Sequence, residues 1–337
     1  MAPALEPSIE PELTLVIACF NEAQVLPFLE TRLRKCLDEM RVTWEVIFID
    51  DGSRDQTLEK LIAMHQTEPR FKVIALSRNF GHQAALCAGL HLAGGRAVGI
   101  LDADLQDPPE LFLQALAKLQ QGFDVVYAIR RKRKENLFKR AAYALFYRLL
   151  RAAAEVNIPL DSGDFCLMRR SVVEAIKAMP ERNIFLRGWR AWSGFLQTGL
   201  EYERAARAAG ETKYPFSRLL RLATDGLFSF STIPLRLVTL LGLGGVLFSS
   251  VLGLFILAWW LFGFRFMGHV AAELPGWTTV VCLMLFLNGL QFLILGCLGE
   301  YIGRTYTEAK QRPRWLVRES FGFSGRTVAD TEKSCES

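Results

Sequence analysis

The sequence predicts an α/β domain with a mostly parallel sheet, followed by a two-helix transmembrane anchor. Three observations predict this arrangement. In residues 13–230, short apolar runs alternate with helix-like stretches, which is typical of a parallel sheet covered by helices. Polar clusters follow four of these runs. Near the end of the 337-residue chain, residues 237–264 and 274–299 contain no charged side chain.

The overall composition hides this division. The chain is 51% hydrophobic and 22% charged, with a net charge of +5 and a mean hydropathy of +0.18. Soluble domains have about 45–50% apolar and about 25% charged residues. These values exclude a disordered chain, and the length excludes a small disulfide scaffold. The seven scattered cysteines include no CxxC pair, which argues against a zinc site and favours a reducing compartment.

Four strands and three helices are expected in order along the first hundred residues. We expect strands at 13–19, 44–49, 71–76 and 97–101, and helices at 23–40, 56–66 and 84–93. Ligands of parallel sheets bind at the carboxyl ends of the strands. The polar residues that follow these strands therefore mark the expected site: Asn21, Glu22, Asp50, Asp51, Arg78, Asn79, Asp102 and Asp104.

The glycine pattern does not match a dinucleotide-binding fold. No GxGxxG follows the first strand, and no GxxxxGK[ST] phosphate loop occurs in the chain. A nucleotide would have to be held by carboxylates, a metal ion and arginines.

Asp102 and Asp104 are the candidate metal ligands. They lie one residue apart directly after a buried strand, and Gln106 adds a neutral oxygen. Mg²⁺ favours such sparse carboxylate sites, with substrate phosphates completing its coordination, and Mn²⁺ fits the same ligands. In isolation the pair could be a solvated turn, but its place in a row of strand-end clusters favours a divalent metal site.

The two uncharged stretches predict membrane spans. Each is longer than the roughly 20 apolar residues that a transmembrane helix needs. The alternative interpretation is a pair of buried helices in a soluble protein. Basic residues flank the pair on both outer sides, and no cleaved signal peptide precedes them. We therefore expect a protein of the inner (cell) membrane with two spans, and with the catalytic domain and both termini in the cytoplasm.

A basic stretch with interleaved apolar residues begins at 130–134 (RRKRK). This pattern favours a helix on an anionic membrane surface, while an ordinary solvated face and a nucleic-acid site are the alternatives. The downstream spans favour a lipid phosphate, so no nucleic-acid partner is expected.

A series of motifs makes the chain similar to a known family. They are VIACFNEA (16–23), IDDGSRD (49–55), LSRNFGHQAAL (76–86), LDADLQDPPE (101–110), DSGDFCLMRR (161–170), MPERNIFLRGW (179–189), RAAGETKY (207–214), SFSTIPLR (229–236) and LGEYIGRTYTEAKQRPRW (298–315). Together they resemble family 2 glycosyltransferases of the GT-A fold, in particular the membrane-anchored polyprenyl-phosphate glycosyltransferases. The bactoprenol glucosyltransferases of O-antigen modification are the most similar subgroup. Two departures are ACFNE in the first motif and His82, where the family commonly has lysine.

The resemblance implies inverting transfer of a sugar from a nucleotide-diphosphate sugar, such as UDP-glucose, to undecaprenyl phosphate. Aminoarabinose, mannose or GlcNAc are alternative sugars for the same lipid. A processive glycan synthase and a non-catalytic membrane scaffold are the remaining alternatives. Residues 311–315 also match the QxxRW signature of processive synthases, but they follow the last span and are interpreted as a basic cytoplasmic segment.

The resemblance also assigns roles to individual residues. It implies that Glu22 and Asp51 hold the uridine, with Asn21 and Asp50 shaping their turns. It implies that Asp102, Asp104 and Gln106 carry the Mg²⁺ or Mn²⁺ ion.

The acceptor side is assigned in the same way. Arg130 would approach the diphosphate or the acceptor phosphate, and Arg207 and Lys213 would grip the acceptor phosphate. Asp164 would lie beside the reacting centre, where it either orients or deprotonates the acceptor.

A homo-oligomer is one expected assembly. The expected organisation of the chain has five parts. They are an N-terminal arm (1–12), a GT-A catalytic domain (13–203), amphipathic interface helices (204–236), two transmembrane helices (237–302) and a cytoplasmic tail (303–337).

Overall fold

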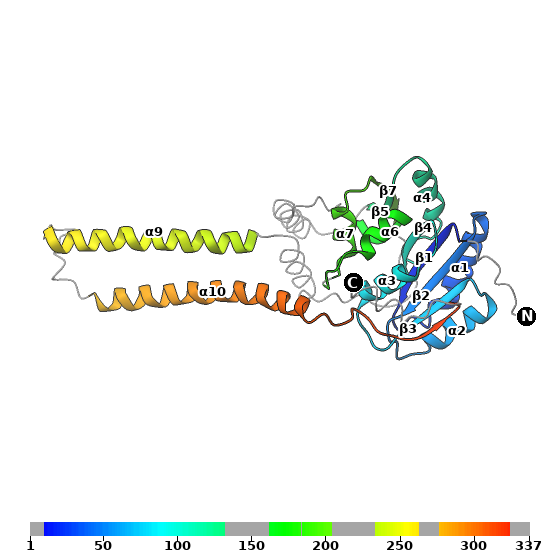
Figure 1. Cartoon of the computed structure of the whole chain (residues 1–337), viewed down its shortest axis with the longest axis horizontal. Helices are drawn as coiled ribbons and strands as arrows, with labels where there is room; N and C mark the ends of the chain where they lie inside the picture. Colours follow the sequence, from blue (N-terminus) through cyan, green and yellow to red (C-terminus); the bar gives the residue numbers. More distant parts are fainter. Residues whose placement is uncertain (1–9, 132–161, 183, 204–232, 263–275, 324–337) are drawn as a thin grey trace, which may run out of the picture. The chain divides into compact units, whose positions relative to one another are not determined.

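The computed structural model describes residues 10–131, 162–182, 184–203, 233–262 and 276–323 (Figure 1). These residues form two compact units. The first contains the described residues up to 203 together with 312–323, and the second contains 233–262 and 276–311. The expected interface helices, with Arg207 and Lys213, lie outside the described residues, as do most residues of the basic stretch that begins at 130.

The first unit is built on one eight-stranded sheet with the order β7-β5-β6-β4-β1-β2-β3-β8. Its strands are β1 (Leu13–Cys19), β2 (Trp44–Asp50), β3 (Phe71–Leu76), β4 (Ala97–Asp102), β5 (Val125–Arg131), β6 (Ser162–Arg169), β7 (Gln197–Glu203) and β8 (Val317–Phe321). Its helices are α1 (Leu26–Glu39), α2 (Thr57–Thr67), α3 (His82–Leu92), α4 (Leu111–Gln120), α6 (Arg170–Lys177) and α7 (Leu186–Trp192).

The predicted parallel sheet is confirmed. β4, β1, β2 and β3 are mutually parallel neighbours, and β5 pairs in parallel with β7. The pairings of β6 with β4 and β5, and of β8 with β3, are antiparallel. β2 and β4 each extend one residue beyond the prediction, so Asp50 and Asp102 are the last residues of their strands.

Burial on both faces explains why the central strands are continuously apolar. Every residue of β1 and of β2 is buried, as expected for parallel strands covered by helices. Helix α1 buries Leu26, Leu29 and Leu33 at the spacing of one helical face. Helix α3 approaches β1 closely because Gly89 has no Cβ, which would lie 2.5 Å from Cγ1 of Val16.

The expected tail, 303–337, needs a correction. Its residues Val317–Phe321 form strand β8, which pairs with β3, and the backbone N–H of Ser77 donates to the carbonyl of Leu316 at 2.9 Å. The side chain of Trp315 is buried against the ring of His91. An unpaired β3 edge would expose a row of backbone donors and acceptors, and β8 covers that edge. This segment therefore belongs to the sheet of the first unit.

The second unit contains two long helices that contact each other, α9 (Ile233–Phe262) and α10 (Trp277–Ala309). Their 30 and 33 residues correspond to about 45 and about 50 Å of helix. Among the described residues, one segment, Phe286–Ala309, is long and apolar enough to cross a membrane; Gly242–Leu252 is a shorter apolar segment. By this criterion, the expected pair of spans is reduced to one candidate.

Candidate active site

The polar clusters meet at one edge of the sheet, as the strand order requires. β4, β1, β2 and β3 are adjacent and parallel, so their carboxyl ends lie side by side. Asp50 and Asp102 end β2 and β4, and Asn21 follows β1 after one residue. The strand-end residues that the sequence singles out are therefore brought together.

Asn21 and Asp50 hold the turns after β1 and β2 together. Asn21 has a left-handed backbone (φ +56°); its N–H donates to Oγ of Ser53 at 3.0 Å, and its Oδ1 accepts from the N–H of Arg54 at 2.9 Å. The Ser53 N–H donates to both carboxylate oxygens of Asp50 at 3.3 Å. Burial raises the pKa of Asp50, and the hydrogen bonds from Ser53 oppose that shift.

Asp51 joins the turn after β2 to the loop after β3. Its carboxylate is buried and accepts from the backbone N–H groups of Phe80 and Gly81 at 2.7 and 3.0 Å. Burial raises the pKa of Asp51, and these two N–H groups oppose the shift. Gly52 is needed beside it, because its φ is +67° and an added Cβ would lie 2.5 Å from the Arg78 carbonyl carbon.

Glu22 is held in the same region through its backbone. Its N–H donates to Oγ1 of Thr57 at 2.9 Å, and the next N–H, of Ala23, donates to the carboxylate of Asp55 at 3.2 Å. The binding of uridine by Glu22 and Asp51 stays a prediction.

Asp102 and Gln106 offer buried oxygens that suit a divalent cation, and the role of Asp104 as a third ligand stays a prediction. The Gln106 N–H donates to Oδ1 of Asp104 at 3.1 Å, which folds the turn. Oδ1 of Asp102 and Oε1 of Gln106 are buried and accept no hydrogen bond from the described residues. Buried oxygens are normally satisfied, and hard oxygen atoms are the ligands that Mg²⁺ and Mn²⁺ prefer. Burial raises the pKa of Asp102 to about 6. His82 lowers this pKa, and the carboxylates of Asp164, Asp107 and Asp104 raise it further.

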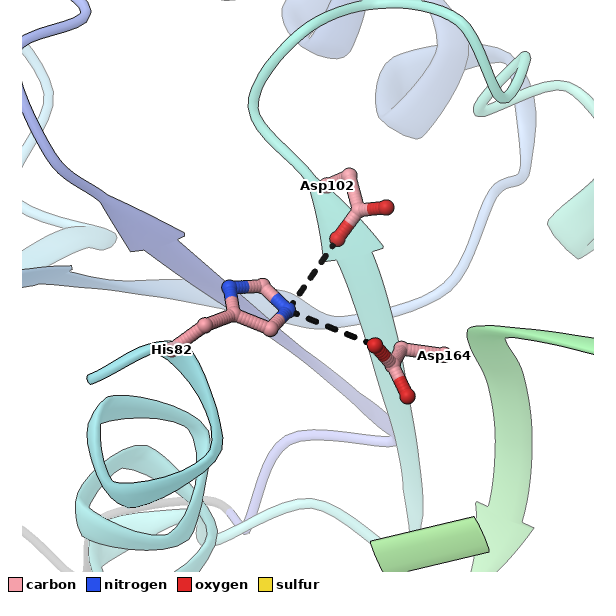
Figure 2. Close-up of side chains that lie close together, drawn as sticks. All are labelled: His82, Asp102 and Asp164. Atoms are coloured by element: carbon pink, nitrogen blue, oxygen red, sulfur yellow. Dashed lines mark ion pairs between the residues drawn. The ribbon is translucent and has the colours of Figure 1, made fainter. Parts of the chain in front are cut away.

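His82 connects two of these carboxylates. Figure 2 shows one nitrogen of its ring facing both carboxylates; Nε2 lies 3.4 Å from Oδ1 of Asp102 and 3.5 Å from Oδ2 of Asp164. Oxygen or nitrogen atoms of the three side chains lie within 4.8 Å of one another, close enough to hold one metal ion. Burial alone would lower the pKa of His82, but the two carboxylates outweigh it and raise the pKa.

Arg187 forms a bidentate salt bridge with Asp164. Its Nε and terminal nitrogen donate to the two oxygens of Asp164 at 2.8 and 3.1 Å. Burial would raise the pKa of Asp164, but Arg187 and His82 hold it well below the usual range, so the carboxylate stays ionised. Arg187 lies in the 179–189 motif, but the sequence indicates no role for it. His82 was singled out only as a departure from the usual lysine, and that departure was the available signal.

Arg130 and Tyr202 lie opposite each other on the neighbouring strands β5 and β7. The Tyr202 hydroxyl donates to the fully buried carboxylate of Asp107, a contact that sequence reasoning missed.

A pocket of about 420 Å³ lies at the carboxyl ends of β1, β2 and β3. Its lining includes Asn21, Ser53, Arg54, Arg78 and Arg318. Three arginine residues in the lining make the pocket suited to an electron-rich ligand.

Comparison with known proteins identifies the family. The sequence model of glycosyl transferase family 2 matches residues 14–177. The uncharacterized glycosyltransferase YkcC of Bacillus subtilis (strain 168) is 42% identical over 94% of this chain and 96% of its own. The prophage bactoprenol glucosyl transferase homolog of Escherichia coli (strain K12) is 38% identical over 91% of this chain and 98% of its own.

A solved structure is also similar. The mannosyltransferase PcManGT of Pyrobaculum calidifontis, in complex with GDP-Man and Mn²⁺, has 16% identity and a TM-score of 0.42, with 89% of each chain covered. A similarity this low carries no argument about ligands.

Proposed function

Because the chain belongs to glycosyltransferase family 2 and is a glycosyltransferase, we propose that it transfers a sugar from a nucleotide-diphosphate sugar to a polyprenyl phosphate. The observation that carries this proposal is the 38% identity to a bactoprenol glucosyl transferase homolog over 98% of that protein's length. The cluster of carboxylates at the strand ends supports it, because these residues suit a metal-bound diphosphate.

The donor would bind along the carboxyl ends of β4, β1 and β2. Asp102, Asp104 and Gln106 would hold Mg²⁺ or Mn²⁺, which supplies positive charge against the diphosphate as it leaves. Asn21, Glu22, Asp50 and Asp51 would shape the nucleoside end. UDP-glucose is the donor that we propose first, and the other sugars remain alternatives.

The acceptor needs little activation. A phosphate monoester has a second pKa of about 6 and is an oxyanion near neutral pH. One of its oxygens would form the bond to the anomeric carbon while the bond to the diphosphate oxygen breaks, and the electron pair leaves with the diphosphate. In-line attack inverts the anomeric configuration, so an α-linked donor gives a β-linked lipid.

Asp164 would orient the reactants in this scheme. A general base works best when its pKa is near the operating pH, whereas Arg187 and His82 hold the pKa of Asp164 well below its ordinary range. An ionised carboxylate with fixed oxygens is suited to accept a hydrogen bond from a sugar hydroxyl. We therefore prefer the orienting role to the deprotonating one.

The acceptor would be met at the membrane. Arg207 and Lys213 are proposed to bind its phosphate, with Arg130 close to either phosphate group. We propose that α9 and α10 both span the inner membrane, which leaves the catalytic domain and both termini in the cytoplasm. The interface helices expected at 204–236 would connect the domain to this anchor.

The test uses the full-length protein in detergent with undecaprenyl phosphate, Mg²⁺ and radiolabelled nucleotide sugars. Undecaprenol, which lacks the phosphate, is the matched control acceptor. We expect undecaprenyl phosphate to be labelled and undecaprenol not to be labelled. Mass spectrometry should find one sugar per lipid. A ladder of sugars would instead support a processive synthase, and transfer to undecaprenol would contradict the role of the phosphate.

A further inference from the structure

Strand β8 places an arginine in the pocket at the ends of β1, β2 and β3. Arg318 lines this pocket together with Asn21 and Ser53, although it lies 297 and 265 residues further along the chain. The chain reaches β8 directly from α10, with residues 310–316 between them.

A bulge in β8 accounts for the placement of Arg318. Val317 pairs with Leu76 and Glu319 pairs with Ala75, so Arg318 is an extra residue without a partner on β3. Bulges redirect a side chain and occur often beside active sites. Because β8 is antiparallel to β3, its first residues lie at the carboxyl end of β3, where the pocket is.

Arg318 has capacity for a ligand. Its side chain is half exposed, and the ion pair described for it, with Glu319, is a long one at 3.4 Å. Arg54 and Arg78 line the same pocket. Three arginine residues lining one pocket favour a ligand with several acceptor oxygens.

The strand order indicates which part of the donor meets this pocket. The candidate metal ligands follow β4, and β4 is separated from β3 by β1 and β2. Three steps between neighbouring strands span about 14 Å. With the diphosphate at the proposed metal ligands of β4, the nucleoside would extend towards the pocket at the ends of β1, β2 and β3, beside β8.

From these observations we propose that Arg318 binds the base of the donor nucleotide, by donating hydrogen bonds to its carbonyl oxygens. The inference rests on the proposed use of a nucleotide-sugar donor. It makes the strand that follows the membrane helices part of the donor site.

The experiment measures nucleotide affinity of the full-length protein in detergent by calorimetry with Mn²⁺. UDP and GDP are first titrated into the wild type. The diphosphate that binds more tightly, the corresponding monophosphate and pyrophosphate are then titrated into both the wild type and Arg318→Ala. We expect the Kd of the diphosphate and monophosphate nucleotides to rise by about tenfold, as for one lost hydrogen bond to a charged donor, with no change for pyrophosphate. Arg312→Ala is the matched control, because Arg312 is exposed and precedes β8.

Four results would overturn the inference: no binding of either nucleotide to the wild type, an unchanged Kd in Arg318→Ala, an equal loss of pyrophosphate affinity, or an equal effect of Arg312→Ala. A thermal melt checks that Arg318→Ala remains folded.

The lipid-transfer assay separates the two claims. If the wild type makes the lipid product but Arg318→Ala binds normally, the inference alone fails; if nucleotide binding depends on Arg318 but no lipid product forms, the proposed function fails.

Discussion

Arg187 forms a salt bridge with Asp164 in the candidate site. It fixes both oxygens of a nearly buried carboxylate and keeps that carboxylate ionised. The sequence predicted the strand-end carboxylates because they directly follow apolar runs. The partner of Asp164 was not predictable in this way, because Asp164 lies within β6 and Arg187 lies on α7, 23 residues further along the chain.

A double-mutant cycle tests Arg187 as a positioning residue for Asp164. We expect Arg187→Ala to lower kcat about tenfold or more, because the freed carboxylate loses its orientation, with a smaller change in the donor KM. In an Asp164→Asn background, the same substitution should have little further effect, since coupled residues are non-additive. Equal losses of kcat in both backgrounds would show that Arg187 acts independently of Asp164.

The raised pKa of Asp102 predicts that metal binding depends on pH. Its pKa is about 6, and a carboxylate must be deprotonated to bind a cation. The proton therefore competes more strongly as pH falls, so we expect the Kd for Mn²⁺ of the nucleotide-free protein to rise about tenfold between pH 7 and pH 5. Free Mn²⁺ measured by electron paramagnetic resonance gives this Kd directly, and a constant affinity over that range would rule out Asp102 as the controlling ligand.

At the scale of elements, prediction succeeded where local pattern determines structure. β1 and β3 have the predicted bounds, and β2 and β4 differ from them by one residue. β8 was missed because Val317–Phe321 has no continuous apolar run. It is a strand because the edge of β3 accepts it, and such pairing is not visible in local sequence.

Trp315 provides a test of whether β8 stabilises the first unit. Its buried ring lies edge-on to His91 of α3, with centroids 5.1 Å apart. Trp315→Ala should lower the free energy of unfolding of this unit by about 3 kcal/mol, as for other buried aromatic truncations. Circular dichroism melts in detergent would detect the lower Tm. Leu316→Ala is the control, because the Leu316 side chain is exposed; equal Tm values for the two variants would contradict the packing role.

At the scale of the whole molecule, the net charge of +5 and the modest hydropathy average over two different parts. The first unit has carboxylates at its strand ends and arginines at its pocket, and the second has long helices with exposed apolar side chains such as Val251 and Phe292. Length and composition of the described helices identify one candidate span, so the second span rests on the uncharged sequence alone.

The proposed topology is tested by epitope tags. We expect a tag inserted between residues 265 and 273 to be labelled in cells with a permeabilised outer envelope and an intact inner membrane. A tag at the C-terminus should be labelled only after the inner membrane is opened, because both termini are proposed to be cytoplasmic. Labelling of both tags, or of neither, with the inner membrane intact would contradict two spans.

The carboxylates after β4 are proposed to support sugar transfer to a polyprenyl phosphate. The most direct measurement is the rate at which labelled sugar enters undecaprenyl phosphate, for the wild type and for Asp104→Asn across the panel of nucleotide sugars. We expect a lipid-linked monosaccharide from at least one donor with the wild type, and none above background with Asp104→Asn. Wild-type activity in Asp104→Asn, or no lipid-linked product from any donor with the wild type, would contradict this proposal.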